Sequence, residues 1–298
     1  MASDAPVLVV GGTGALGAQV VSALLARDLP VRALVRPASN AERLEQAGVQ
    51  IVRGDLMDPA SLVRAIDGAD SVVTSAAGYT RHTKGDDGDI DTIGNRNLVD
   101  AASQVGVRRF VLTSVLTCDQ AVDVPHFWHK KLVEDRLAEK RVPFVSLRPG
   151  AFLDSLVKSA DLSKGRLNWV GNPDAEFTCV LSADVADALA LAVDAPGVDG
   201  EILDLGWDQP VTMNGLARIL AEQSGQAFAV RTIPAGLVNG ADWVLGRFKP
   251  RIKDVAAMLR YINSGRYVAD TTRQGVVFGA VPTAEEAVSG FLKKMTAR

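Results

Sequence analysis

The first half of the chain alternates short apolar runs with longer segments in which apolar residues recur at helical spacing. Val7–Val10 is apolar throughout, which is the pattern of a parallel strand covered on both faces. Similar runs predict five further strands, at Val31–Val35, Gln50–Val52, Ser71–Ser75, Arg109–Thr113 and Phe144–Leu147. The segments between them predict helices over Ala15–Ala26, Asn40–Ala47, Ser61–Ile66, Ile90–Gln104 and Pro125–Lys140. This alternation predicts an α/β fold with a doubly wound parallel sheet and helices on both faces.

The regular alternation ends after Arg148-Pro149-Gly150. The second half still predicts a strand at Glu201–Leu205, helices at Met213–Gln223, Ala235–Leu245 and Lys253–Ile262, and a last helix that begins near Pro282. We therefore predict a sheet domain over residues 1–150 and a smaller C-terminal part over residues 151–298. From that second part, about residues 182–206 are expected to return to the sheet domain.

Composition and charge exclude several classes of protein. The 298 residues include 32 Lys and Arg against 35 Asp and Glu, so the net charge is −3 and no basic stripe for nucleic acid is present. Two cysteines, Cys118 and Cys179, supply neither a disulfide framework nor the clustered spacing of a zinc site, so no metal is expected. The N-terminal residues lack a signal sequence, and no window reaches the ~18 apolar residues of a membrane span. We therefore expect a cytoplasmic protein with no membrane partner.

The strongest motif follows the first predicted strand directly. Gly11, Gly14 and Gly17 are spaced as in GxxGxxG, and Gly12 with the last two also satisfies GxGxxG. Glycines at such a turn let main-chain N–H groups approach a pyrophosphate and let the following helix pack on the strand. This context predicts a Rossmann-type dinucleotide-binding domain. The same turn brings three more residues against the cofactor, which are Thr13, Ala15 and Leu16.

The end of the second predicted strand indicates which dinucleotide is bound. An NAD site places an acidic residue ~20 residues after the glycine loop, where it binds the ribose 2′-hydroxyl. Here Arg36 occupies that place, and a guanidinium pairs with the 2′-phosphate that a carboxylate would repel. We therefore predict NADPH (NADP), with Ser39 and Thr13 as further contacts. The alternative is that Arg36 is an ordinary surface residue at a strand end.

Taken in order, the motifs of this chain resemble the short-chain dehydrogenase/reductase superfamily. The closer resemblance is to its atypical branch, which includes NmrA-like and isoflavone-reductase-like proteins, and it spans nearly the whole chain. The motifs that carry it are residues 11–17 (Gly-Gly-Thr-Gly-Ala-Leu-Gly), Arg36, Gly54-Asp55-Leu56, Ala76-Ala77-Gly78, residues 97–102 (Asn-Leu-Val-Asp-Ala-Ala), Arg148-Pro149-Gly150 and residues 182–186 (Ser-Ala-Asp-Val-Ala).

The resemblance also implies which residues lie along the cofactor. Two would lie beside the adenine, three would line the cofactor after the fourth strand, and three would pass along the nicotinamide. In that order they are Asp55 and Leu56; Ala76, Ala77 and Gly78; and Pro149, Gly150 and Phe152.

The chain departs from the superfamily at its catalytic pair, Tyr-x-x-x-Lys, in which the phenol donates a proton and the lysine holds the nicotinamide ribose. None of the three tyrosines of this chain is followed by lysine at that spacing. On the expected helix, Lys130 matches the family's lysine and His126 stands in the place of the tyrosine. His126 is a candidate proton donor because imidazole titrates near neutral pH. The alternative is that His126 caps the helix or is exposed, and that a water or a ribose hydroxyl donates the proton.

The remaining candidates are a hydroxyl and a set of rings. Ser114, after the fifth strand, is the third catalytic candidate, with Thr113 and Thr117 as alternatives. Rings concentrate in the second half of the chain, which favours a flat, largely apolar substrate, although each ring alone is more often part of a core. The candidates for the substrate pocket are Tyr79, His82, Trp128, Phe152 and Trp169, with Trp243 and Tyr261 as further members of the ring set.

Two functions are compatible with this pattern. The leading one is an NADPH-dependent reductase of a ketone, quinone or enone on a bulky aromatic compound, in secondary metabolism, with residues 1–150 binding NADP and the C-terminal part binding substrate. The competing one is a non-catalytic NADP(H)-binding regulator of the NmrA type, which the missing tyrosine favours. The expected partner is a small aromatic molecule and not a nucleic acid, and both a monomer and a homodimer stay open.

Overall fold

The computed structural model describes residues 5–78, 90–157, 164–236, 240 and 250–296, and it consists of two compact units. The first unit comprises Met1–Val115, Trp128–Arg148 and Ala183–Leu203, and the second comprises Leu116–Phe127, Pro149–Ser182 and Asp204–Arg298. Residues 116–127, which the sequence puts in the sheet domain, group with the second unit, and residues 183–203 group with the first.

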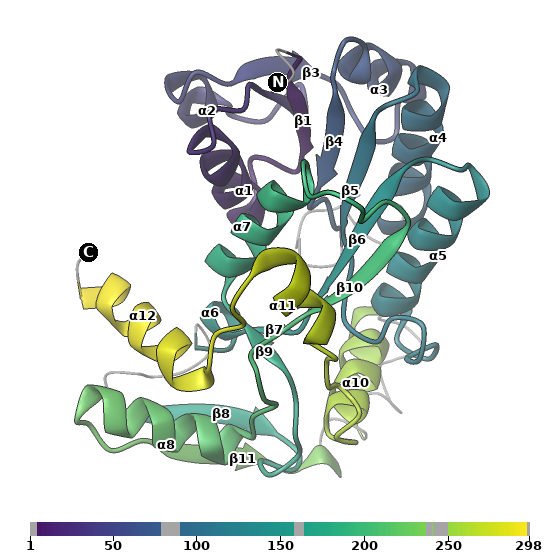
Figure 1. Ribbon diagram of the computed structural model, residues 1–298. Coiled ribbons are helices and arrows are strands. Elements are labelled where there is room, and N and C mark those ends of the chain that lie inside the picture. The colour runs from purple at the N-terminus through teal and green to yellow at the C-terminus, as the bar shows by residue number, and fades with distance from the viewer. Residues whose placement is uncertain (1–4, 79–89, 158–163, 237–239, 241–249, 297–298) are drawn as a thin grey trace. The chain divides into compact units, whose positions relative to one another are not determined.

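The first unit is built on a seven-stranded sheet with the strand order β10-β6-β5-β4-β1-β2-β3 (Figure 1). Its strands are β1 (Val7–Val10), β2 (Val31–Val35), β3 (Gln50–Arg53), β4 (Ser71–Thr74), β5 (Arg109–Thr113), β6 (Phe144–Pro149) and β10 (Glu201–Leu205). β1 pairs in parallel with both β2 and β4, and the pairs β2–β3, β4–β5 and β5–β6 are parallel too. The strand order therefore reverses at β1, and the carboxyl ends of β1 and β4 flank the crevice where such sheets bind ligands. The predicted α/β fold is confirmed.

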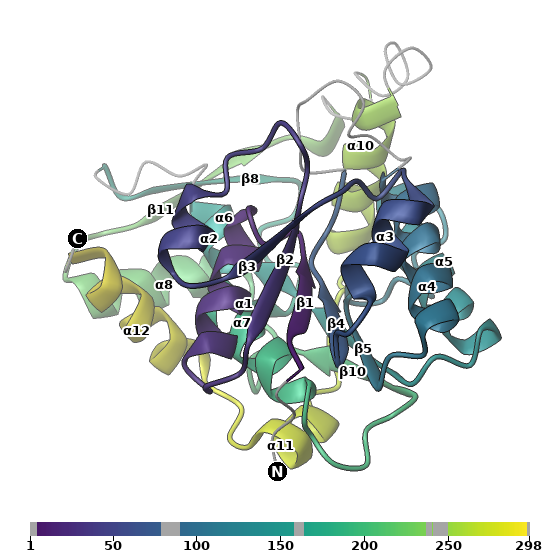
Figure 2. The ribbon, with the colours of Figure 1, turned by 90° about the horizontal axis from the view of Figure 1, so that it is seen from above.

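Helices cover both faces of this sheet. α3 (Pro59–Ile66), α4 (Asn95–Val105) and α5 (Pro125–Glu139) lie on one face, and α1 (Ala15–Leu25) and α7 (Ser182–Ala192) lie on the other (Figures 1 and 2). α2 (Glu42–Gln46) lies between β2 and β3 in the chain. The core under α3, α4 and α5 is fully buried, and it packs Leu8, Val72 and Phe110 of the strands with Leu62, Leu98 and Leu137 of the helices.

Local sequence accounts for the start of α3 but not for the π-helical turn before α4. α3 begins after Asp58, whose carboxylate accepts hydrogen bonds from the N–H groups of Ala60 and Ser61, with Pro59 in the first turn. The predicted helix over Ile90–Gln104 is divided, because a π-helical turn, η1 (Ile90–Gly94), precedes α4. Periodicity does not separate such a turn from the α-helix that it joins.

The second unit holds two small sheets and five further helices among its described residues. β7 (Ala151–Phe152) pairs in parallel with β9 (Cys179–Val180), and β8 (Arg166–Val170) pairs in parallel with β11 (Ala229–Ile233). Its helices are α6 (Leu153–Leu156), α8 (Met213–Ser224), α10 (Pro250–Ile262), α11 (Thr272–Phe278) and α12 (Ala284–Thr296). Most of the predicted helix Ala235–Leu245 lies outside the described residues. In the part of the chain that is described, none of the helices has the length and apolar character needed to cross a membrane.

A charged cluster joins the ends of β4, β5 and α7 within the first unit. The Arg108 guanidinium donates hydrogen bonds to the Asp70 carboxylate, with Nε 3.0 Å from Oδ1 and Nη2 2.6 Å from Oδ2. Arg108 also donates to the Val193 carbonyl oxygen and to Asp194 just after α7, at 3.1 Å each. The hydrogen bond from Arg108 holds the pKa of Asp70 below its usual value, although partial burial acts in the opposite direction.

We predict that Asp70→Asn lowers the free energy of unfolding at pH 7. Because the Arg108 side chain is 44% exposed, solvent screening limits the expected loss to about 1 kcal/mol. A carboxyl whose pKa is lowered by folding stabilises the protein above its unfolded pKa, and this stabilisation is lost as the pH falls through the folded pKa. The difference between wild type and variant in urea denaturation should therefore shrink below about pH 4. A difference that stays constant down to pH 2 would contradict this assignment, and Asp67→Asn, at an exposed carboxyl nearby, is the matched control.

Candidate functional site

The turn from β1 into α1 leaves no room for a side chain at Gly17 and strains one at Gly11. Gly11 has φ +93°, and its carbonyl oxygen accepts a hydrogen bond from the Gly14 N–H at 2.8 Å. A Cβ added at Gly17 would lie only 2.1 Å from that same oxygen. α1 begins at Ala15, followed by Leu16, and no side chain caps its first turn. Main-chain N–H groups therefore stand at the carboxyl end of β1, where they can bind an anion.

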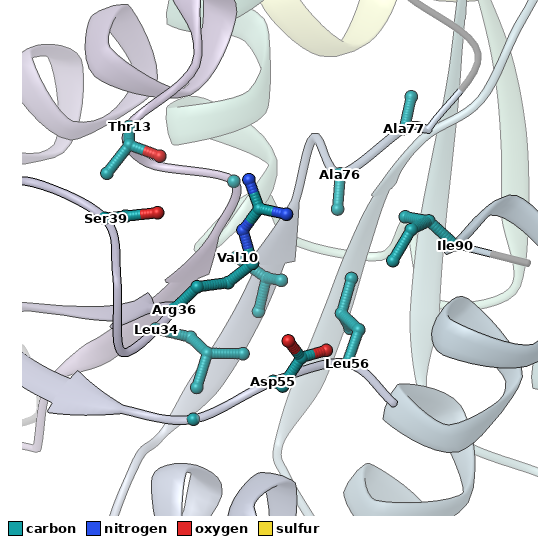
Figure 3. Close-up of a pocket in the computed structure, with 12 residues that line it drawn as sticks. Val10, Thr13, Leu34, Arg36, Ser39, Asp55, Leu56, Ala76, Ala77 and Ile90 are labelled. Atoms are coloured by element: carbon teal, nitrogen blue, oxygen red, sulfur yellow. The ribbon is translucent and has the colours of Figure 1, made fainter. Parts of the chain in front are cut away.

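A pocket of about 530 Å³, part of it open to solvent, lies beside this turn, at the carboxyl ends of β1, β2 and β4 (Figure 3). Val10, Leu34, Gly54 and Ile90 form part of its wall. The other lining residues all come from the predicted cofactor set, and they are Gly11, Thr13, Arg36, Ser39, Asp55, Leu56, Ala76 and Ala77. The structure therefore brings together predicted cofactor residues from distant parts of the chain, such as Gly11 and Ala77.

Arg36 extends from the end of β2 into this pocket, with its guanidinium between Ser39 and Ala76 in the view of Figure 3. The Ser39 N–H donates to the Arg36 carbonyl oxygen at 3.0 Å, so the loop after β2 turns back on itself. Arg53, at the end of β3, braces that loop, because its Nη1 donates to the carbonyl oxygens of Arg36 and Ser39 at 3.1 and 2.7 Å. Sequence reasoning missed Arg53, since an arginine at the end of the third strand, unlike one at the end of the second, carries no cofactor signal in the sequence.

The segment after β3 forms another wall of the pocket. A Cβ at Gly54 would lie 2.8 Å from both Leu34 Cδ1 and Ser61 Oγ, so the chain passes close to β2 and α3 there. Asp55 Oδ1 accepts a hydrogen bond from the Met57 N–H at 2.9 Å. Asn97 on α4 donates to the Leu56 carbonyl oxygen at 3.0 Å. These contacts hold Asp55 and Leu56 against the pocket, where the resemblance implies the adenine.

Lys130 reaches the edge of the pocket from α5. Its Nζ donates to the carbonyl oxygen of Ala76, a lining residue, at 3.2 Å, and the residue is only 8% exposed. Asn95 Nδ2 donates to the same oxygen at 3.4 Å, and Asp91 Oδ1 accepts from the Gly78 N–H at 3.1 Å. Asp91 and Asn95 are buried at the π-helical turn and at the start of α4, and the sequence analysis did not select them. A π-turn is frequent at functional sites, but it leaves no signal in periodicity.

The third catalytic candidate, Ser114, takes part in a buried ion-pair cluster. Its hydroxyl donates to Glu134 Oε1 at 2.8 Å, and Ser146 Oγ donates to the same oxygen at 2.8 Å. Arg148 Nη2 donates to Glu134 Oε2 at 2.7 Å, with side-chain exposures of 9% for Arg148 and 1% for Glu134. Ser114 therefore helps to fix α5 against β5 and β6, which favours a structural role over a substrate contact.

In the second unit, His126 forms a close pair with a carboxylate of α10. His126 Nδ1 lies 2.8 Å from Asp254 Oδ1, and the His126 ring packs edge-on against Phe127 at 4.6 Å. The His126 backbone N–H also lies 3.4 Å from Asp254 Oδ1, at the start of α5. The carboxylate therefore orients the imidazole.

The contacts of the other candidate residues in the second unit explain some of them by packing alone. A Cβ at Gly150 would lie 2.5 Å from the Thr178 carbonyl oxygen, so backbone packing explains that glycine. Pro149 ends β6, and Phe152 lies on β7. Trp169 is 6% exposed, stacks on Phe177 at 5.1 Å, and donates from Nε1 to the Asn172 carbonyl oxygen, so it is a core residue of this unit. Burial raises the pKa of the Tyr267 hydroxyl well above its usual value, which disfavours a role as proton donor.

Three candidates for the ring-lined substrate pocket cannot be placed, and a fourth lies in the first unit. Tyr79, His82 and Trp243 lie outside the described residues, and Trp128 lies on α5 in the first unit, half-buried. Within the residues that are described, no group of three or more His, Cys, Asp or Glu side chains is arranged to hold a metal ion.

Comparison with known proteins shows the family. Residues 3–257 match the NmrA-like family. The chain belongs to this family. Three proteins that are similar to this chain have names that refer to different activities. The photosystem II assembly factor Ycf39 of Trieres chinensis is 25% identical over 269 residues, covering 86% of this chain and 81% of that protein.

Two further members of this comparison are named as oxidoreductases. The NAD(P)H azoreductase of Xenophilus azovorans is 27% identical over 234 residues, covering 74% of each chain. A crystal structure of an NADPH-dependent quinone oxidoreductase from Escherichia coli, complexed with NADPH, has a TM-score of 0.78 and 23% identity, and covers 96% of this NmrA-like chain and 99% of that one. The last likeness shows that the fold is shared.

We predict that Gly17→Ala destabilises this NmrA-like protein by about 2 kcal/mol or more, because the new methyl group and the Gly11 carbonyl oxygen cannot both keep their places. Gly290→Ala in α12 is the matched control, since a Cβ there meets nothing within 4 Å and alanine favours a helix. Denaturant midpoints compare the two variants. A Gly17→Ala variant as stable as wild type would show that α1 does not pack this closely on β1.

Proposed function

We propose that this protein is an NADPH-dependent reductase, and that the pocket at the carboxyl ends of β1, β2 and β4 holds the cofactor. The observation that carries the proposal is the lining of that pocket. It contains a glycine turn, it has an arginine in place of an acidic residue after β2, and a buried lysine reaches its edge. The reductases among the relatives and structural neighbours support the same reading.

The residues of the pocket fit NADP(H) in three respects. The uncapped first turn of α1 offers N–H groups to the pyrophosphate, and the glycine at position 17 lets the helix approach. Arg36, with Ser39 and Thr13 beside it, would bind the 2′-phosphate, and Arg53 keeps the Arg36 loop in place. Asp55 and Leu56 would lie beside the adenine.

The reaction we propose is hydride transfer to a ketone, quinone or enone of a bulky aromatic compound. NADPH supplies the hydride when it is bound. Lys130 would hold the nicotinamide ribose, since its ammonium group is already fixed at the Ala76 carbonyl oxygen on the edge of the pocket. Pro149, Gly150 and Phe152 would pass along the nicotinamide, as the resemblance implies. Holding the reactants in place would provide much of the rate.

The proton that completes the reduction needs a donor other than the usual tyrosine. His126 is the donor we propose, because Asp254 lies 2.8 Å from Nδ1 and orients the imidazole ring. A bound water or a ribose hydroxyl is the alternative. Ser114 is a weaker candidate, because its hydroxyl donates to the buried carboxylate of Glu134.

A second candidate function is non-catalytic. The photosystem II assembly factor Ycf39 is similar to this chain over 269 residues, and its name refers to assembly and not to a reaction. In that case the chain would bind NADP(H) and act on a protein partner without turning over a small molecule.

We predict that purified protein oxidises NADPH with at least one member of a panel of quinones, aromatic ketones and enones, followed by the loss of near-ultraviolet absorbance. Lys130→Ala should lower turnover by ~100-fold or more, because the nicotinamide ribose loses its ligand. Lys131→Ala is the matched control, since Lys131 pairs with Asp135 at the surface. Tight NADPH binding with no turnover on any class would favour the non-catalytic function, and wild-type rates in Lys130→Ala would refute the role of Lys130.

We predict that Arg36→Glu reverses the cofactor preference. Loss of a charge-assisted contact and a new repulsion should lower the ratio of NADPH to NADH affinity by ~100-fold. Arg43→Glu, which makes the same charge change at an exposed position on α2, should leave that ratio unchanged. Cofactor affinities from calorimetry decide the question, and an unchanged ratio in Arg36→Glu would show that this residue does not contact the 2′-phosphate.

A further inference from the structure

The second unit contains a depression of its own, between the loop at residues 120–125 and one side of α10. It has a volume of about 570 Å³, and every lining residue belongs to the second unit. Such a volume is of the size that holds a small molecule rather than a macromolecule. None of the cofactor residues lines it, so it is a site separate from the pocket of Figure 3.

The rim of the depression is basic, whereas the chain as a whole has a net charge of −3. Lys253, Arg260 and Arg266 line it, against a single carboxylate, that of Asp123. Lys253 and Arg260 are seven positions apart, so they lie on one side of α10 two turns from each other. An anion in the depression would therefore meet a local excess of positive charge, although the net charge of the chain is negative.

The floor of the depression is apolar and carries one aromatic ring. Ala121, Val124, Ala257 and Tyr261 are buried, and the Arg266 guanidinium lies 4.9 Å from the centre of the Tyr261 ring. A flat ligand can pack on such a floor while its charged end meets the rim. The Tyr261 hydroxyl is buried and has no hydrogen-bond partner among the described residues, so a polar group remains to be satisfied beside the depression.

The depression is lined by the residues that directly precede the His126–Asp254 pair in the chain. Pro125 and Lys253 both line it, and the residues that follow them, His126 and Asp254, are bonded to each other. A ligand held between the loop and α10 would therefore lie against the two segments that fix His126. This proximity favours the acceptor of the reduction as the ligand over an unrelated effector.

We propose that this depression binds the anionic substituent of the acceptor, so that the preferred substrates are aromatic carbonyl compounds or quinones that carry a carboxylate or a sulfonate. That the ligand is the acceptor of the hydride rests on the proposed function, whereas binding of an anion in the depression can be tested without turnover. The carboxylate end pairs with Lys253 and Arg260, and the ring packs on Tyr261 and the small residues beside it.

The test compares two ligands of one shape, anthraquinone-2-carboxylate and anthraquinone-2-carboxamide, by calorimetry on the full chain without cofactor. The carboxylate should bind about tenfold tighter than the carboxamide, and this preference should fall as the salt concentration rises. The double variant Lys253→Gln, Arg260→Gln should bind both ligands equally. The double variant Arg231→Gln, Lys294→Gln removes the same charge at exposed positions outside the depression and should keep the preference.

Turnover separates this inference from the proposed function. With NADPH, the carboxylate should show about tenfold lower KM than the carboxamide. The double variant Lys253→Gln, Arg260→Gln should abolish that difference in KM. Equal binding of both ligands by the wild type, or a preference that survives in the Lys253→Gln, Arg260→Gln variant, would overturn the anion site even if both quinones are reduced. Charge-dependent binding without reduction of any acceptor would instead sink the proposed function and the assignment of the ligand as acceptor.

Discussion

The contact between the first turn of α1 and the end of β1 sets the conditions for everything at the cofactor pocket. The Gly11 carbonyl oxygen would be 2.1 Å from any Cβ at Gly17, and it also accepts the Gly14 N–H. Because no side chain separates helix from strand, the N–H groups of the helix start stand at the edge of the sheet, beside the ends of β2 and β4. The Arg36 loop and the Asp55 segment form other walls of the pocket. They can contribute to dinucleotide binding only because the main-chain N–H groups at this end of the sheet are open to the pyrophosphate.

Around that contact the first unit fixes its loops with side-chain hydrogen bonds to main-chain carbonyl oxygens. Arg53 holds the loop of Arg36 and Ser39, and Asn97 holds Leu56. The Ala76 carbonyl oxygen accepts from both Lys130 and Asn95, so one acceptor ties α4 and α5 to the exit of β4. A site whose ligating groups are held in this way loses little freedom when a ligand binds, which favours affinity.

The sequence allowed the sheet to be predicted because buried parallel strands are rich in apolar residues, and β1, β2 and β5 were found with their bounds unchanged. Most residues of the cofactor pocket could also be predicted from the sequence, since the glycine turn and the strand ends follow a fixed order in the chain. What the sequence did not reveal depends on partners far away. Ser114 is committed to Glu134, and Trp169 to Phe177, through contacts that no spacing rule predicts. Asp254, 128 positions from His126, was invisible for the same reason.

The measurement that tests the account most directly is calorimetric titration of the wild-type chain with NADPH and, separately, with NADH. The account predicts one NADPH site per chain and at least ~10-fold weaker binding of NADH, because only NADPH carries the 2′-phosphate that Arg36 is proposed to bind. Equal affinities would contradict the assignment of Arg36, and absence of binding by either dinucleotide would contradict the assignment of the pocket.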